Sequence, residues 1–501
     1  MSKKIPQAQI PTDEKQVHEL VRLANSYLSA HGVLMKPNPI GDSQVLDTFT
    51  AKNPWFPEAI VPAPVAITPG IFYKECFDKA VKLQKIMNKL YDAVSRDEQF
   101  IHSVFKEIEG SDEFTRRLYE IYKQTVHHEP KQTISLGIHR SDYLIDTSNN
   151  STDQIKQVEF NTISVSFSSL TAQVGKMHRY FLERTGYKNF LVGENDISFD
   201  QLPENDSLTS FADGLASAFK AYGNPNAVVL IVGQHKERNV YDQQWIELQL
   251  WERHSIKLTV RSHQELNETG YLGTGTNDNG KLFIDDGQEV AVVYYRSGYT
   301  PDDYNSEADW DARLMAEKSM AIKCPTIPYQ LVGAKKVQQV LALPGTVEKY
   351  IFDKDEQSLI RESFAELYPL DESQDGRKAY KTAMETPINY VLKPQREGGG
   401  FNTYGNDIPK VLGNMDIEQQ KGYILMSLIK PPLYDSVFLR NGKLELIKSI
   451  SELGIYGIWL SDNDKVLVNS NGGHLLRSKS FDTSEGGVAS GFAVVDSPLL
   501  V

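Results

Sequence analysis

One short stretch of the chain places two cations, a carboxylate and three consecutive glycines where a predicted strand ends. Lys393 closes an apolar run, and Arg396, Glu397 and the glycines at 398–400 follow it. Glycines let backbone amides approach an anion closely and adopt positive φ, and a lysine beside them offsets the charge of the anion. A carboxylate next to phosphates is a ligand that Mg²⁺ prefers. The stretch therefore predicts a loop that closes over a polyphosphate, and its alternative is a flexible surface loop.

A second group of polar residues lies on a predicted half-exposed strand at 154–161. Because side chains alternate along a strand, Glu159 and Asn161 lie on one face, and Val158 and Phe160 lie on the other. Carboxylate and amide oxygens on the same face suit a divalent cation. An exposed polar face is the alternative, and this pattern taken alone favours it.

Several arginines stand next to apolar or glycine-flanked runs. Arg140 follows the run 134–138, Arg296 follows a buried-strand pattern, and Arg477 lies close to Lys479. A planar guanidinium binds a carboxylate through two hydrogen bonds, so these positions favour a substrate that bears carboxylates. For Arg140 the alternative is a surface ion pair.

Two other segments are candidates for substrate contact. The segment 485–491 is rich in small residues, which would let a substrate lie against the backbone, although a tight turn has the same composition. The segment 237–243 follows an apolar strand pattern at 227–232. Open α/β sheets bind ligands at the carboxyl ends of their strands, so this segment is placed where a ligand is expected.

Several other chemistries are not supported. The run 275–281 has the spacing of a phosphate-binding P-loop, but Leu282 replaces the hydroxyl that binds magnesium, and Asn279-Gly280 is a hairpin turn signal. The 11 histidines lack zinc-ligand spacing, and no Gly-x-Ser-x-Gly elbow occurs. Taken together, the polar groups predict ATP-dependent activation of an acid.

Charge and composition narrow the range of partners. The 501 residues include 66 Asp and Glu against 53 Lys and Arg, which disfavours wholesale binding to nucleic acid or to anionic lipid. No apolar run approaches the ~20 residues of a membrane span. The two cysteines, Cys76 and Cys324, are too few for a disulfide framework or a thiolate zinc site. We expect a cytoplasmic protein without nucleic-acid or membrane partners.

The elements that must position these residues change character along the chain. Helical spacing covers 17–28 and most of 74–123, and helix and strand patterns alternate over 208–330. Half-exposed strands of antiparallel type are expected before that region, at 154–161, and after it, at 389–393, 423–426 and 445–451. We therefore expect an α+β protein with an inserted α/β module at 227–330, which divides the larger part into 1–226 and 331–501.

Six motifs, in this order along the chain, resemble eukaryotic glutathione synthetase, a family of ATP-grasp ligases. They read Val-Glu-Phe-Asn-Thr-Ile-Ser-Val-Ser (158–166), Glu-Arg-Asn-Val-Tyr-Asp-Gln (237–243), Tyr-Arg-Ser-Gly-Tyr (295–299), Lys-Pro-Gln-Arg-Glu-Gly-Gly-Gly (393–400), Ile-Ser-Glu-Leu-Gly-Ile-Tyr-Gly (450–457) and Leu-Leu-Arg-Ser-Lys (475–479). The resemblance runs from about residue 136 to the end, and more weakly over the amino-terminal helices.

The resemblance implies both a fold and an activity. In the ATP-grasp fold, ATP lies between two antiparallel sheets under a glycine-rich lid, here at about 390–410, and a substrate loop is expected at about 485–491. The implied reaction joins γ-L-glutamyl-L-cysteine to glycine, with cleavage of ATP to ADP and phosphate through an acyl phosphate. This is the second step of glutathione biosynthesis. The resemblance also implies Mg²⁺ as cofactor and a homodimer.

The resemblance assigns roles to matching positions, among them catalytic roles for Arg477, Lys335 and Lys393. The implied magnesium ligands are Glu159, Asn161 and Glu397. The implied ATP contacts are Glu159, Lys335, Lys393, Glu397, Gly398, Gly399, Gly400, Asn402, Tyr404, Met426, Ser427, Leu428, Ile429, Glu452, Lys479 and Glu485. The implied peptide contacts are Arg140, Ile163, Ser164, Val165, Ser166, Glu237, Arg238, Asn239, Gln243, Arg296, Ser297, Gly298, Tyr299, Arg477, Val488 and Ala489.

Four residues depart from the usual pattern of the family: Phe401, Ser427, Ser297 and Ser490. Ser490 lies in the loop that distinguishes glycine users from β-alanine users, so a ligase for β-alanine or serine is one alternative. Phe401 and Ser427 belong to nucleotide segments, and a catalytically silent nucleotide-binding protein is the other. The residue pair 489–490 remains small, which keeps glycine as the first choice.

Overall fold

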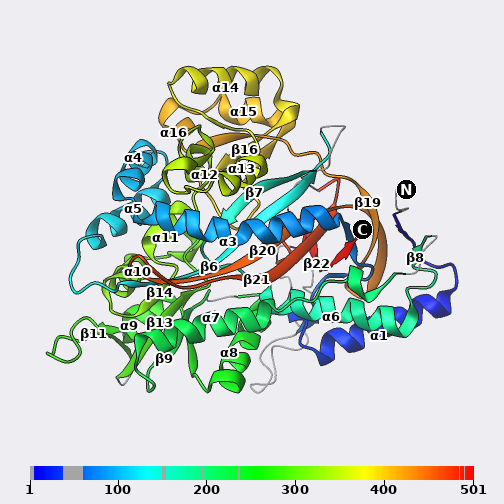
Figure 1. Cartoon of the computed structure of the whole chain (residues 1–501), viewed down its shortest axis with the longest axis horizontal. Helices are drawn as coiled ribbons and strands as arrows, with labels where there is room; N and C mark the ends of the chain where they lie inside the picture. The colour runs from blue at the N-terminus through cyan, green and yellow to red at the C-terminus, as the bar shows by residue number, and fades with distance from the viewer. Residues whose placement is uncertain are drawn as a thin grey trace.

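The computed structural model describes residues 5–37, 60–148, 154–193, 197–234, 237–285, 287–483, 486–489 and 491–501. Within these ranges the protein is a mixed α+β structure built on sheets of seven, six and four strands (Figure 1). Three two-stranded sheets accompany them: β1 with β8, β2 with β3, and β5 with β23. The expected α+β class is thus confirmed.

The seven-stranded sheet is the centre of the molecule, with the strand order β19-β4-β22-β21-β20-β6-β7. Its strands are β4 (Val65–Ala66), β6 (Ile134–Asp146), β7 (Gln154–Asn161), β19 (Tyr434–Arg440), β20 (Lys443–Asp462), β21 (Lys465–Ser480) and β22 (Ala493–Asp496). Neighbouring strands are antiparallel except β22 and β4. The expected strand at 445–451 is only part of β20, because β20 continues alongside β6 and β21.

Different helices cover the two faces of this sheet. A Cβ on Gly457 of β20 would lie 2.2 Å from Asn88 Oδ1 of α3 (Lys74–Arg96). The next residue, Ile458, faces α7 (Ser207–Tyr222), where a Cβ on Gly214 would lie 2.8 Å from Ile458 Cγ2. Since neighbouring residues of a strand point to opposite faces, α3 and α7 enclose the sheet between them, as Figure 1 shows.

The six-stranded sheet contains the predicted alternation of helices and strands. Its strands are β9 (Val228–Val232), β10 (Leu258–Arg261), β11 (Tyr271–Leu272), β12 (Leu282–Ile284), β13 (Gln288–Tyr295) and β14 (Ile322–Cys324). β10, β9, β13 and β14 are mutually parallel, and β11 and β12 add an antiparallel edge. Gly280 has a φ of +75°, which confirms a turn at the rejected P-loop run, and a strand rather than a helix follows it.

The four-stranded sheet has the order β15-β18-β16-β17 and lies under α14, α15 and α16 in Figure 1. Its strands are β15 (Leu367–Pro369), β16 (Tyr390–Pro394), β17 (Thr403–Tyr404) and β18 (Tyr423–Ser427), and all its pairs are antiparallel. The glycine run at 398–400 lies between β16 and β17. The expected strands at 389–393 and 423–426 are confirmed, displaced by a residue at their ends.

The remaining helices are α1 (Glu14–Ala30), α4 (Glu98–Ile108), α5 (Glu113–Thr125), α6 (Ser168–Thr185), α8 (Val240–His254), α9 (His263–Thr269), α10 (Glu307–Lys318), α11 (Ile327–Val332), α12 (Lys335–Ala342), α13 (Lys354–Ser363), α14 (Gln374–Glu385), α15 (Ile408–Leu412) and α16 (Ile417–Lys421). The small strands are β1 (Gln7–Ala8), β2 (Leu34–Met35), β3 (Val61–Pro62), β5 (Gly70–Phe72), β8 (Leu191–Val192) and β23 (Pro498–Leu500). Within the described ranges, no helix combines the length and apolar character that crossing a membrane requires.

A buried carboxyl group connects strands of the central sheet. Asp496 Oδ1 accepts hydrogen bonds from the backbone N–H groups of Gly70 (3.1 Å) and Ser497 (2.7 Å). Its Oδ2 lies 2.6 Å from Ser478 Oγ, and that hydroxyl is 2.8 Å from Ser451 Oγ. Burial raises the pKa of Asp496 to about 7 in spite of these hydrogen bonds. The paired hydroxyls can reverse their direction and accept the carboxyl proton.

This raised pKa predicts how stability depends on pH. Because the pKa of the folded state exceeds the ordinary 3.8, the folded protein binds this proton more tightly. The resulting stabilisation is complete below about pH 4 and is lost as the pH rises through about 7. Asp496→Asn keeps the shape of the neutral form. We expect the two proteins to have equal free energies of unfolding below about pH 4, and the variant to exceed the parent by about 3–4 kcal/mol at pH 8, because each pKa unit is worth about 1.4 kcal/mol. Urea unfolding of both proteins checks this, and a pH-independent difference would contradict it.

Candidate active site

Two adjoining cavities lie where the seven-stranded and four-stranded sheets face each other. The first, about 390 Å³, is walled by Leu144 and Val158 on one side and by Val391 and Met426 on the other. The predicted nucleotide residues that line it are Lys393, Asn402, Tyr404, Met426, Ser427, Leu428, Ile429, Glu452 and Lys479. The predicted adenine segment and the predicted phosphate cation therefore border one space.

The second cavity, about 330 Å³, continues from the first. The two share Lys393, Asn402, Tyr404, Glu452, Arg477 and Lys479 among their lining residues. The predicted residues that line only the second cavity are Arg140, Glu159, Asn161, Ile163, Ser164, Val165, Ser166, Tyr299, Glu397, Gly398, Gly399, Gly400, Val488 and Ala489. The predicted metal ligands thus lie beside the predicted peptide contacts, where the nucleotide cavity ends.

A buried lysine lies between two of the predicted metal ligands. Lys335, the first residue of α12, is 4% exposed, and its Nζ lies 3.6 Å from Glu159 Oε2 and 3.2 Å from Glu397 Oε1. It also donates to the backbone carbonyl of Arg396. Burial would lower the pKa of Lys335, but the two carboxylates raise it above its ordinary value. The ammonium therefore serves as the counter-charge of both acids.

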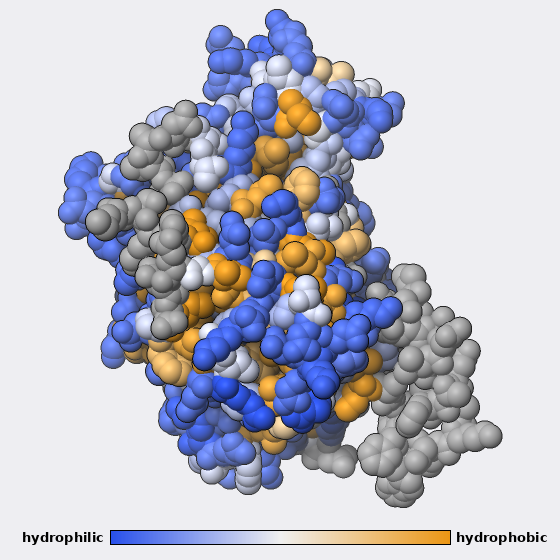
Figure 2. All heavy atoms as spheres, turned by 90° about the vertical axis from the view of Figure 1, so that its right-hand side faces the viewer, coloured by the Kyte–Doolittle hydropathy of each residue, from blue (hydrophilic) through white to orange (hydrophobic). Residues whose placement is uncertain are grey.

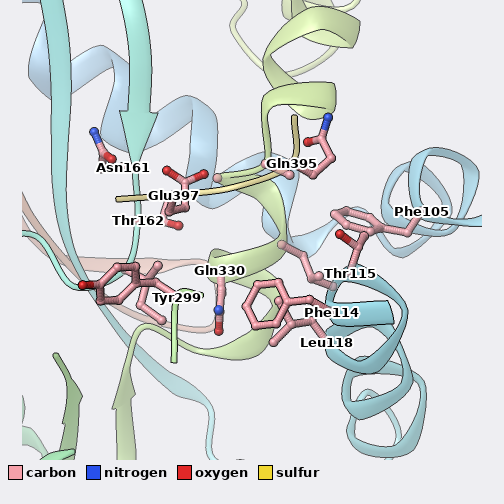
Figure 3. A pocket seen from close by; sticks show the side chains of 14 residues that line it. Phe105, Phe114, Thr115, Leu118, Asn161, Thr162, Tyr299, Gln330, Gln395 and Glu397 are labelled. Carbon is pink, nitrogen blue, oxygen red and sulfur yellow. The ribbon is translucent and has the colours of Figure 1, made fainter. Parts of the chain in front are cut away.

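The two acids respond differently to this environment. Burial opposes ionisation of Glu159, yet Lys335 and Lys393 together lower its pKa to about 2. For Glu397 burial prevails over Lys335 and raises the pKa to about 7. Figure 3 shows the Glu397 carboxyl group and the Asn161 amide facing the same small space. An additional cation there would favour the charged form of Glu397.

The second predicted phosphate cation reaches the same place from the four-stranded sheet. Lys393 on β16 is 2% exposed, and its Nζ donates to the Val158 carbonyl at 2.8 Å and lies 3.8 Å from Met426 Sδ. Burial lowers its pKa, and Glu159 offsets part of that effect. Lys393 thus lines both cavities with no carboxylate within ion-pair distance among the described residues.

A fully buried acid, Asp142, connects three predicted site residues. Arg140 donates through Nε to Asp142 Oδ1 at 2.6 Å and through Nη2 to Oδ2 at 2.8 Å. Asn161 donates through Nδ2 to Oδ2 at 3.0 Å, and Arg477 donates to the same oxygen at 3.1 Å. Because its nitrogen is taken by Asp142, the amide oxygen of Asn161 points toward Glu397 (Figure 3). Asp142 therefore sets the orientation of both arginines and of a metal ligand.

A second fully buried acid, Asp242, organises the peptide side. It accepts hydrogen bonds from the backbone of Phe167 (2.9 Å) and Ser169 (2.8 Å) at the start of α6. Its ion pair with Arg296 has a separation of 3.1 Å, and both side chains are almost fully buried. Ser164, in the same segment, has a φ of +52° and donates to the Tyr295 carbonyl at 3.4 Å. Asp242 thus joins Arg296 to Phe167 and Ser169, which directly follow the segment 163–166.

The residues after β9 form a hydrogen-bonded group. Gln243 donates to Glu237 Oε2 at 2.9 Å, and the backbone of Asn239 donates to Glu237 Oε1 at 2.7 Å. Arg238 donates to the carbonyl of Ala489, which lines the second cavity. The predicted peptide segment at 237–243 is thereby joined to the predicted substrate loop.

The glycine run adopts the backbone conformation that its composition favours. Gly398, Gly399 and Gly400 have φ values of +87°, +76° and +84°. A side chain at any of the three would strain the backbone. Nothing lies within 4 Å of a Cβ built on Gly399, so that residue borders open space.

Some predicted residues line neither of these two cavities: Lys335, Glu237, Arg238, Asn239, Gln243, Arg296, Ser297 and Gly298. The contacts above connect Lys335, Glu237, Arg238, Asn239, Gln243 and Arg296 to the cavities, and Ser297 is 2% exposed. Glu485 and Ser490 lie outside the described residues.

The environment of Arg140 differs from what the sequence suggests. The run at 134–138 is the first part of β6, which continues past Arg140 to Asp146 because it pairs with β20 and β7. Arg140 is 5% exposed, so its ion pair with Asp142 is buried and the surface alternative is wrong. Pattern analysis missed Asp142 and Asp242. The period of two along a strand, which places Asp142 on the same face as Arg140, was the available signal for the first.

Comparison with known proteins decides the family. The model of the eukaryotic glutathione synthase ATP-binding domain matches residues 14–500. The chain belongs to the eukaryotic glutathione synthetase family. Rat glutathione synthetase is 39% identical over 489 residues, which are 97% of each chain. The human protein is 37% identical over the same proportions, and the chloroplastic enzyme of Solanum lycopersicum is 41% identical over 88% of this chain and 78% of its own.

A solved structure of a related protein has a similar fold. A glutathione synthetase-like effector from Globodera pallida, solved in its apo form, has a TM-score of 0.76 and 22% identity. The match covers 99% of this chain and 100% of that one. In this member of the glutathione synthetase family, the first cavity lies between the seven-stranded sheet and the four-stranded sheet. This is the expected ATP-grasp arrangement. It is an ATP-dependent ligase of that family.

Proposed function

We propose that this protein joins the carboxylate of γ-L-glutamyl-L-cysteine to the amine of glycine and forms glutathione at the expense of ATP. Membership of the glutathione synthetase family supports this assignment. The observation that carries it is the group formed by Lys335, Glu159 and Glu397, whose two acids line the second cavity together with Lys393, which lines both cavities. Charge is concentrated there, between the space for a nucleotide and the space for a peptide.

ATP is proposed to occupy the first cavity. Its adenine would lie against Met426 to Ile429 and Tyr404, and its phosphates would point toward Lys393 and Lys335. Lys393 is suited to this role because it is a buried ammonium bonded to a carbonyl, and an anion would stabilise its charged form. The glycines at 398–400 would cover the phosphates with their backbone N–H groups.

Mg²⁺ is proposed to bind Glu159, Asn161 and Glu397. The donors fit this ion, since Mg²⁺ combines one or two carboxylates with phosphate oxygens and water. The orientation of Asn161, whose nitrogen is held by Asp142, supports the assignment because it leaves the amide oxygen for a cation. Within the described ranges no cluster of three or more His, Cys, Asp or Glu could hold a metal by protein ligands alone, which agrees with sharing of the ion with ATP. When bound, Mg²⁺ supplies positive charge to the phosphates.

The dipeptide and glycine are proposed to occupy the second cavity, with Arg140 and Arg477 near their carboxylates. The cysteinyl carboxylate oxygen attacks the γ-phosphorus of ATP, the bond to the bridging oxygen breaks, and ADP leaves. The amine of glycine then attacks the acyl carbon, phosphate departs and takes up the proton that the amine loses. Lys335, Lys393 and Arg477 stabilise the charge in both steps. The lid excludes water, which would otherwise hydrolyse the acyl phosphate.

The chain is proposed to be divided into parts with different roles. Residues 227–330 would form the inserted substrate-binding module, 1–226 the first part of the main domain, and 331–501 the ATP-binding part, with the lid at 390–410 and the substrate loop at 485–491. The six-stranded sheet, which contains strands from this module alone, supports the division.

The first test of this function is an assay of amine preference. Purified protein with ATP, Mg²⁺ and γ-glutamylcysteine should release ADP fastest with glycine, and slower with β-alanine, serine or no amine. Glutathione is identified in the product by mass. Preference for β-alanine or serine would establish the alternative acceptor. The absence of amine-dependent turnover would contradict the proposed reaction and leave the silent nucleotide binder or another donor substrate.

We further propose a homodimer that works in the cytoplasm. Figure 2 shows apolar side chains among charged ones on the side where β19 lies. Next to that strand, Leu433 is 45% exposed and Leu446 is 49% exposed, which supports a partner on this face. Both cysteines are buried and neither forms a disulfide bond, in agreement with a reducing compartment. Sedimentation equilibrium at assay concentrations tests the dimer, and a single monomer mass would contradict it.

A further inference from the structure

A single carboxylate, Asp303, holds the loop at 296–300, which carries four of the predicted peptide contacts. Asp303 is the last residue of the short helix η2 (Pro301–Asp303), directly after that loop. Its Oδ2 accepts hydrogen bonds from the backbone N–H groups of Gly298 (3.0 Å), Tyr299 (3.0 Å) and Thr300 (3.2 Å). Its Oδ1 accepts from Gln234 Nε2 at 2.8 Å. Both oxygens are therefore fully engaged with the loop and its neighbour.

The same network fixes the side chain of Tyr299. The Nε2 group of Gln234 that donates to Asp303 also donates to Tyr299 Oη, at 3.1 Å. The other side of the loop is held as well, since Gln330 Nε2 donates to the Gly298 carbonyl at 2.8 Å. Gly298 has a φ of +88°, and a Cβ there would lie 2.8 Å from Tyr304 Oη. These contacts fix the backbone conformation of the loop and the position of the Tyr299 ring.

The ring of Tyr299 touches the glycine-rich lid. A Cβ built on Gly398 would lie 3.0 Å from Tyr299 Cε2 and 3.8 Å from Thr300 Cγ2. Figure 3 shows Tyr299 and Gln330 on one side of a small cavity and Glu397 on the other. A second contact anchors the start of the lid, where Arg396 Nη1 lies 2.9 Å from Asp112 Oδ1 at the beginning of α5. The lid is therefore in contact with α5 and with the peptide loop.

We propose that Asp303 is a positioning residue for the ligation, which acts through Tyr299 on closure of the lid. This inference rests on the proposed function. A lid that closes on a well-placed Tyr299 shields the acyl phosphate from water, and the same loop contacts the dipeptide. Occupancy of the peptide site and closure over the nucleotide are thereby coupled through one loop. A small displacement of such a loop is sufficient for a large loss of rate, about 100-fold per ångström in favourable cases.

Asp303→Asn tests this proposal because an amide cannot replace the carboxylate in either orientation. Its NH₂ group would face the three backbone N–H groups or the Nε2 group of Gln234, and all of these are donors. The matched control is Asp302→Asn, which removes the same charge one residue earlier. Asp302 is exposed and contributes no side-chain hydrogen bond among the described residues. We expect the control to behave like the parent.

Two kinetic readouts separate positioning from general damage. For Asp303→Asn we expect kcat to fall by about 10- to 100-fold, while the KM for ATP changes by less than about twofold. The ratio of ADP released to glutathione formed should rise above one, because water reaches the acyl phosphate under a poorly closed lid. Circular dichroism and the melting temperature show whether the variant is folded. A folded variant with a ratio of one and an unchanged kcat would overturn the proposal.

A binding readout is independent of turnover. Trypsin cleavage after Arg396 is measured with Mg²⁺ and the non-hydrolysable analogue AMP-PNP, with and without γ-glutamylcysteine. The dipeptide should protect the parent and Asp302→Asn at least about fivefold more than it protects Asp303→Asn. Equal protection of all three would overturn the coupling. Should Asp303→Asn fail to fold, Gln234→Leu replaces it. This variant removes the donor to Tyr299 Oη and to Asp303 Oδ1 but leaves the three backbone hydrogen bonds of Asp303 Oδ2, and it should show the same loss at smaller amplitude. If the parent makes no glutathione the proposed reaction fails, whereas this protection assay still reports on the lid.

Discussion

Glu397→Gln is expected to reduce the rate of glutathione formation by at least about 100-fold while the protein remains folded. The substitution removes the only negative charge of the lid loop that faces Lys335, and with it a proposed ligand of Mg²⁺. Because burial raises the pKa of Glu397 to about 7, the neutral glutamine resembles a form that the folded protein already populates. The melting temperature should therefore stay within a few degrees of the parent value.

The decisive measurement is ADP and glutathione formation over a range of Mg²⁺ concentrations. Glu372→Gln, an exposed substitution of the same kind outside both cavities, serves as the control and should retain full activity. Parental turnover of Glu397→Gln at limiting Mg²⁺ would show that the carboxylate has no part in binding the ion.

Asp142→Asn is expected to affect both stability and activity. The free energy of unfolding should fall by about 3–5 kcal/mol, because the buried guanidinium group of Arg140 and the partly buried one of Arg477 lose the charge of the acid between them. Activity should fall by at least about 100-fold, since both arginines and the amide of Asn161 are free to turn. The apparent affinity for Mg²⁺ in the presence of ATP should fall with it.

Urea unfolding and Mg²⁺ titration of the same preparation check the two effects together. Asp462→Asn, at the far end of the neighbouring strand β20, makes the same chemical change outside the site. The free energy of unfolding of this control should be within about 1 kcal/mol of the parent value, as for most substitutions outside the core. Asp142→Asn with parental stability and parental Mg²⁺ dependence would mean that Asp142 does not hold the site together.

The parts of the site that follow from local pattern could be predicted from the sequence. Strand alternation places Glu159 and Asn161 on one face, and that is where the structure has them. The glycine run at 398–400 predicts left-handed backbone, and all three residues adopt it. The alternation of helices and strands over 208–330 likewise predicts the parallel strands of the six-stranded sheet.

The parts that depend on contacts between distant segments could not be predicted in this way. Lys335 opens a helix whose sequence has no motif, and its role arises because Glu159 and Glu397 approach it from two different sheets. The roles of Asp242 and Asp303 also depend on distant contacts, because a single acid in a loop or helix forms no sequence pattern that predicts its partners. Resemblance to the family identified Lys335, and only the fold identified the two acids.

The hairpin of β20 and β21, which forms one side of the site, is expected to open locally much less often than the lid. Glu452 and Arg477 are direct partners in its register, with paired residues on both sides of them and with β6 beyond. The lid, in contrast, is followed by β17, a strand of two residues at the edge of the smaller sheet. In hydrogen–deuterium exchange, amides of the hairpin should exchange only through global unfolding, and those of the lid through small local openings. Substrates can therefore enter and leave through local fluctuations, while the residues that stabilise charge stay in the most slowly exchanging part of the chain.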